Sequence, residues 1–147
     1  MGQSAKAILA FGFDLGDDID AFPEILLDED RGLDLEKVIL EDAGIIRPDS
    51  KWLQSPEWQS YFFEKKQAIA DYPVDIIFHC DFDYGSCYFL AIRGTEIDCY
   101  AGDVKPIKPS NLISQITEGD LQKFRNWCEA KNIPYKQPEW CLMSIYG

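Results

Sequence analysis

The sequence has a single histidine, His79, in 147 residues, and it carries none of the common catalytic signatures. It contains no G-x-S-x-G nucleophile turn, no phosphate-binding P-loop and no G-x-G-x-x-G dinucleotide motif. A Cys–His catalytic pair also needs a third group that orients the histidine, and no motif places Cys87 or Cys99 beside His79. We therefore predict a non-enzymatic protein, and we expect no cofactor.

Long apolar runs, an export signal and paired cysteines are missing as well. No run approaches the ~20 apolar residues that a membrane-spanning helix requires. Residues 1–9 contain one lysine and no cleavage-site pattern, so we expect no signal peptide and no membrane partner. The five cysteines are an odd number without a C-x-x-C pair, which is typical of free thiols in a reducing compartment. The sequence thus predicts a cytoplasmic protein.

Apolar residues make up 46% of the chain, which is enough for a core, and the length predicts a single globular domain over residues 1–147. Apolar runs bounded by turn residues predict strands near 5–13, 74–80, 87–93, 96–101 and 140–146. Helices are predicted after the N-cap residues Asp34, Ser55 and Thr117. This order predicts an α+β fold, with an antiparallel-rich sheet, a central three-strand meander and about three helices packed against it.

Two further expectations concern details of this fold. Gly94 and Thr95 are predicted to form a two-residue hairpin turn, which would place Arg93 opposite Glu96 within the meander. The aromatic residues at helical spacing are predicted to lie in the core, among them Trp58, Phe62 and Trp127.

The net charge of −12 is concentrated in one segment. Residues 14–42 hold 12 of the 26 acidic side chains and only two basic ones. Such a field repels nucleic acid and attracts basic protein surfaces. We predict that the loop over residues 17–33 binds the basic surface of a partner protein through Asp17, Asp18, Asp20, Asp28, Glu29 and Asp30. Apolar residues of the same loop, such as Leu26 and Leu27, are expected to dock after charge has guided the encounter. Alternatively, the acidic segment only increases solubility.

The sequence also contains two clusters of potential metal ligands. Residues 14–20 include four aspartates, but their spacing does not fit the twelve-residue calcium loop. His79 and Cys80 are residue types that bind zinc, but neighbouring residues of a strand point to opposite faces. We predict no metal site and a structural, hydrogen-bonded His79. A small metal-dependent enzyme centred on His79 is the alternative.

Two stretches of the chain carry a family resemblance. One is Ala5-Lys6-Ala7 continuing to Phe11-Gly12-Phe13-Asp14-Leu15-Gly16, and the other comprises His79-Cys80, Asp83-Tyr84 and Leu90-Ala91. They resemble a family of small bacteriophage-encoded proteins that has no established activity, so the resemblance assigns no functional residue. It implies a phage or prophage gene expressed in a bacterial cytoplasm. By analogy, it implies an inhibitor of a basic host protein that handles nucleic acid, of the anti-CRISPR or anti-restriction type. An immunity protein that neutralises a nuclease toxin is the alternative.

Overall fold

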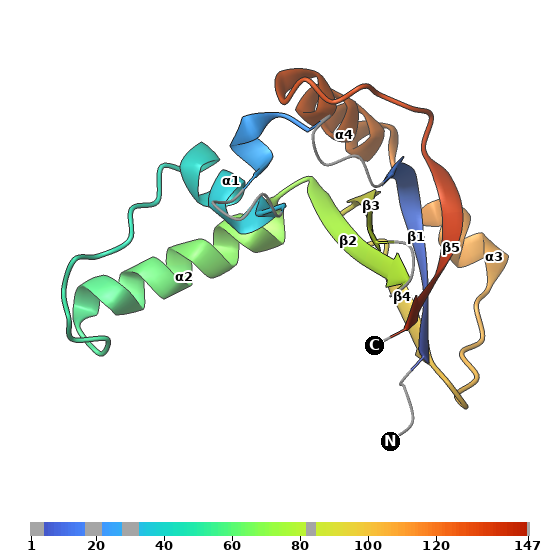
Figure 1. Cartoon of the computed structure of the whole chain (residues 1–147), viewed down its shortest axis with the longest axis horizontal. Coiled ribbons are helices and arrows are strands. Elements are labelled where there is room, and N and C mark those ends of the chain that lie inside the picture. The colour runs from blue at the N-terminus through green and yellow to red at the C-terminus, as the bar shows by residue number, and fades with distance from the viewer. Residues whose placement is uncertain (1–4, 17–21, 28–32, 82–84, 147) are drawn as a thin grey trace. The chain divides into compact units, whose positions relative to one another are not determined.

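A computed structural model of the chain describes residues 5–16, 22–27, 33–81 and 85–146. The chain divides into two compact units (Figure 1). Unit 1 comprises Met1–Ala21 and Pro73–Gly147, and unit 2 comprises Phe22–Tyr72. The fold is α+β, as the sequence predicts, with one sheet of five antiparallel strands and four α-helices among the described residues. That the two units form a single globular domain stays a prediction.

The sheet of unit 1 is organised around β1 (Ala5–Gly16), which pairs with three other strands. β5 (Glu139–Tyr146) runs along one edge of β1, opposite residues 5–12. β4 (Ile97–Tyr100) and β3 (Gly85–Ile92) follow one another along the other edge, opposite residues 6–9 and 12–16. β2 (Val74–Asp81) pairs with β3 as an antiparallel hairpin. The first strand of the chain is therefore central to the sheet.

The predicted three-strand meander is only partly present, because β4 pairs with β1 and not with β3. Residues 93–96 form a kink, so the predicted pairing of Arg93 with Glu96 is wrong. Gly94 provides the required positive φ of 84°. The hydroxyl of Thr95 accepts a hydrogen bond from the Phe11 amide at 3.2 Å and donates one to the Ile92 carbonyl at 2.7 Å. The Thr95 hydroxyl thus takes the place of a backbone carbonyl as the acceptor for the Phe11 amide of β1.

Apolar side chains cover both faces of the sheet. One face holds a buried cluster of Ile8, Ala10, Ile77, Phe89, Ala91 and Met143. Ile77 and Met143 belong to the outer strands β2 and β5, and these strands contact each other, so the sheet curls around the cluster. Gly12 allows β1 and β3 to approach closely, because a Cβ at this position would lie 1.9 Å from the Leu90 carbonyl oxygen.

Helix α4 (Glu118–Ala130) contributes the second layer of unit 1. Phe13 of β1 meets Phe124 of α4 edge to face, with ring centroids 5.7 Å apart. Trp127 is also buried, which confirms its predicted core position.

Thr117 and Asp120 form the capping box that the sequence predicts at the start of α4, with bonds of 3.1 Å and 2.9 Å. A short helix before it, α3 (Pro109–Ser114), was not predicted. Pro109 at its first position is the signal that could have indicated it.

Unit 2 contains a 3₁₀ turn, η2 (Glu24–Leu26), and two helices, α1 (Leu35–Asp42) and α2 (Pro56–Asp71). Both predicted caps are present: Asp34 accepts a hydrogen bond from the Lys37 amide, and Ser55 accepts one from the Trp58 amide. The two helices are joined by an ion pair between Glu36 and Lys65 at 2.6 Å. The buried side chains of unit 2 include Leu26, Leu27, Val38, Ile39, Trp58 and Tyr61. None of the described helices has the length and apolarity needed to cross a membrane.

Candidate functional site

The six carboxylates predicted to bind a partner lie outside the described residues: Asp17, Asp18, Asp20, Asp28, Glu29 and Asp30. The described part of the same loop corrects one expectation. Leu26 and Leu27 are 1% and 4% exposed, and Leu27 forms a β-bridge with Leu33. They belong to the buried part of unit 2, so the prediction that they dock on a partner is wrong.

A different segment of unit 2 exposes large apolar side chains. Ile46 is 86% exposed, Trp52 and Leu53 are each 62% exposed, and Phe62 and Phe63 are 49% and 69% exposed. We call these five residues the Ile46–Phe63 surface. They come from the connection between α1 and α2 and from the first half of α2. Single exposed apolar residues are common on proteins, and the presence of five within residues 46–63 makes this segment a candidate for binding.

Trp58 fixes this connection against α2. Its indole Nε1 donates a hydrogen bond of 2.7 Å to the Ser50 carbonyl, and the guanidinium of Arg47 lies 5.4 Å from its ring centroid. The rings of Tyr61 and Phe62 each lie 5.4 Å from the Trp58 ring. The connection is therefore bound along α2 by a buried aromatic residue, and it presents a defined surface.

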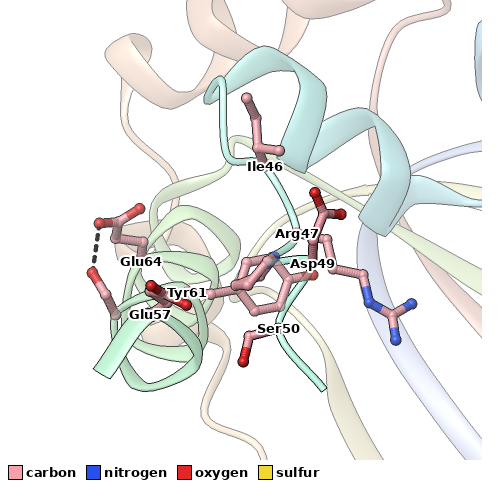
Figure 2. Close-up of a pocket in the computed structure, with 9 residues that line it drawn as sticks. Ile46, Arg47, Asp49, Ser50, Glu57, Tyr61 and Glu64 are labelled. Carbon is pink, nitrogen blue, oxygen red and sulfur yellow. Dashed lines mark hydrogen bonds between the residues drawn. The ribbon is translucent and has the colours of Figure 1, made fainter. Parts of the chain in front are cut away.

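A groove of about 570 Å³ lies between this connection and α2 (Figure 2). The helix lines it with residues at spacings of three and four, which places them on one helical face. These residues are Glu57, Ser60, Tyr61 and Glu64, and the connection contributes Ile46, Arg47, Pro48, Asp49 and Ser50. The ring of Tyr61 lies between the helix and the connection in Figure 2.

Carboxylates dominate the charge of the groove. Glu57, Glu64 and Asp49 are exposed, and none of them forms an ion pair among the described residues. Glu64 accepts a hydrogen bond of 3.0 Å from the Ser60 hydroxyl. Arg47 is the basic residue of the lining, and Figure 2 shows its side chain extending away from Glu57 and Glu64. The groove thus offers negative charge beside an aromatic ring.

His79 lies on the β2–β3 hairpin as predicted, directly opposite Cys87. Its Nε2 is buried 3.4 Å from Asp14 Oδ1, but the two atoms do not form a hydrogen bond. Nε2 has no hydrogen-bond partner in the described part of the chain, so this atom does not show the bonding that we expected. Within the same part of the chain, no three histidine, cysteine, aspartate or glutamate side chains are grouped closely enough to hold a metal ion.

Burial keeps the thiols of two described cysteines protonated at neutral pH. Cys87, Cys99, Cys128 and Cys141 form no disulfide, and Cys99 lies opposite Ala7 in the sheet. Burial raises the pKa of the Cys128 thiol to about 11, and it also raises the pKa of Cys141. A thiol that is protonated at neutral pH is a poor nucleophile.

Sequence reasoning missed the helical part of the Ile46–Phe63 surface because it assigned helical aromatic residues to the core. Trp58 is buried as predicted, but the core position predicted for Phe62 is wrong. The run Tyr61-Phe62-Phe63 contained a usable signal. Successive helical residues are rotated by about 100°, so three consecutive rings cannot all face one core. Tyr61 is buried, and the two phenylalanines are exposed.

No family model, curated protein or solved structure significantly matches this chain. The resemblance to phage-encoded proteins therefore stays a hypothesis that rests on the two stretches that carry it.

Proposed function

We propose that this chain is a non-enzymatic protein that binds a basic partner protein through unit 2. The Ile46–Phe63 surface is the observation that carries the proposal. The buried centres of protein interfaces are enriched in aromatic residues, and tryptophan is prominent among the residues that dominate binding energy. Trp52, Phe62 and Phe63 are side chains of this kind, and a partner that covered them would remove their apolar area from water.

The charge of unit 2 supports a basic partner. Residues 22–72 contain 12 acidic and 6 basic side chains, and the carboxylates of the groove lie in the same segment as the exposed aromatic residues. Proteins that handle nucleic acid carry lysine- and arginine-lined surfaces for phosphate. Inhibition of such a protein, a nuclease or an effector complex, is the more specific form of this proposal. The chain would then cover a surface that otherwise holds nucleic acid.

The proposal is tested by comparing three baits in bacterial lysate with quantitative mass spectrometry. The baits are the natural chain, the double variant Trp52→Ser/Phe63→Ser, and the control Leu142→Ser. Leu142 is 74% exposed in unit 1, so the control removes a similar apolar side chain outside the Ile46–Phe63 surface. We expect a basic protein that the natural chain and the control retain and that the double variant loses.

Thermal unfolding of all three baits provides the folding control, since substitutions of exposed side chains change stability by about 0.5 kcal/mol or less. If no captured protein depended on Trp52 and Phe63 while the baits stayed folded, the proposed surface would be wrong. Once a partner is identified, its cleavage of nucleic acid with and without the chain tests inhibition. Unchanged cleavage at saturating chain would contradict the inhibitor form alone.

A further inference from the structure

We infer that the groove between the α1–α2 connection and α2 receives an extended basic segment of the partner, with two cationic side chains three residues apart. The inference rests on the proposed function and specifies which part of the partner binds and in what conformation. It follows from three observations: the spacing of two carboxylates on α2, the aromatic residue between them, and the contact of the nearby arginine with the Trp58 ring.

The spacing comes from the helix. Glu57 and Glu64 are seven residues apart on one face of α2, which corresponds to roughly 10 Å along the axis at about 1.5 Å per residue. A segment in the extended polyproline II conformation advances roughly 3.1 Å per residue with three residues per turn, so the side chains of residues i and i+3 lie on one face, roughly 9 Å apart. Such a segment along α2 can therefore place one cation at each carboxylate.

The surface between the two carboxylates suits the rest of such a segment. Tyr61 lies one helical turn from each of them and, at 8% exposed, forms part of the floor of the groove. The aliphatic stems of lysine and arginine pack on apolar surface of this kind. Ile46 on the connection also lines the groove and supplies additional exposed apolar surface.

The charges of the groove determine whether an acidic or a basic segment can bind there. Glu57, Glu64 and Asp49 would repel an acidic or phosphorylated segment. Arg47 does not neutralise them, because its guanidinium lies over the Trp58 ring and extends away from both glutamates. A basic occupant therefore complements the groove.

Two hexapeptide amides of identical composition test the inference. Each has two arginines, and the remaining positions are alanine and glycine. In the spaced peptide the arginines occupy positions two and five, and in the adjacent peptide they occupy positions two and three. Both are titrated into the full chain and followed by amide chemical shifts. We expect the spaced peptide to bind several-fold more tightly and to shift the amides of residues 46–50 and 57–64.

Two double variants with the same change in charge identify the site. Glu57→Gln/Glu64→Gln removes both carboxylates of the groove, and Glu41→Gln/Asp103→Asn removes two exposed carboxylates elsewhere. The groove variant removes two exposed ion pairs with the peptide, and each is worth at most a factor of about five in affinity. We therefore expect it to weaken binding of the spaced peptide about tenfold. The control should bind it as the natural chain does. Equal binding of the two peptides, or an equal loss in both variants, would overturn the inference.

The same variants separate this inference from the proposed function. If the partner depended on Trp52 and Phe63 but was captured equally well by the groove variant, the groove inference would fail and the proposed function would stand. If the spaced peptide bound the groove but no partner depended on Trp52 and Phe63, the proposed surface would fail instead.

Discussion

The kink between β3 and β4 predicts a sharp difference between two substitutions of Thr95. This side chain is 2% exposed, and its hydroxyl is the acceptor for the Phe11 amide. Thr95→Val keeps the shape of the side chain but leaves this amide without a partner. An unsatisfied buried donor costs about 1–3 kcal/mol, so we expect a loss of about 2 kcal/mol. The Ile92 carbonyl keeps the bond from the Thr95 amide at 3.3 Å and adds little to this loss.

Thr95→Ser is the matched variant, because it retains the hydroxyl and removes one methyl group, which is worth about 0.8 kcal/mol. Urea unfolding gives the free energies, and hydrogen exchange measures the Phe11 amide directly. We expect this amide to lose protection in Thr95→Val and to keep it in Thr95→Ser. In the hairpin that the sequence suggested, position 95 would be an exposed turn residue, and valine would change stability by about 0.5 kcal/mol or less. A small change of that size, with Phe11 still protected, would refute the kink.

Four other outcomes follow from the structure. Hydrogen bonds from Thr117 hold the pKa of Asp120 below its ordinary value of 3.8, so the capping box stabilises the chain above that value and is lost as the pH falls through the lowered pKa. Asp120→Asn should therefore reduce the fall in melting temperature between about pH 5 and pH 3. Cys128, with its pKa of about 11, should react with iodoacetamide far more slowly at neutral pH than the partly exposed Cys99, as peptide mapping would show. Gly12→Ala should destabilise the chain by about 1–3 kcal/mol in urea unfolding, because its methyl group would collide with the β3 backbone. Gel shifts at physiological salt should reveal no micromolar binding to DNA or RNA, because the chain has 26 acidic and only 14 basic residues; tight, salt-sensitive binding would contradict this expectation.

Much of the fold could be predicted because the signals are local. Asp34, Ser55 and Thr117 each cap the helix that they were predicted to cap, since a cap is a contact between residues three positions apart. The hairpin of β2 and β3 was predictable for the same reason. The neighbours of β1 were not, because strands that are far apart in sequence find each other through packing that no short motif describes.

The candidate site was harder to predict than the fold. Apolar residues at helical spacing look alike in sequence whether a core or solvent faces them, so Phe62 and Trp58 could not be separated by pattern alone. The groove depends on Trp58 holding the connection at Ser50, which is a tertiary contact. The acidic content of residues 14–42 was plain from the sequence, whereas the carboxylates of the groove lie outside that segment.

The arrangement of strands around β1 has a consequence for the order in which the chain becomes ordered during synthesis. β1 is translated first among the described strands, but its partner β5 comes after every other described element. Unit 2 is contiguous in sequence and can fold while the chain is still growing. Until β5 is made, the backbone groups along one edge of β1 stay unpaired, and the strand contains the apolar residues Ile8, Leu9 and Phe11. An unpaired edge of an apolar strand can pair with other chains. A nascent chain that stalls before residue 139 would therefore have a folded unit 2 beside an aggregation-prone strand.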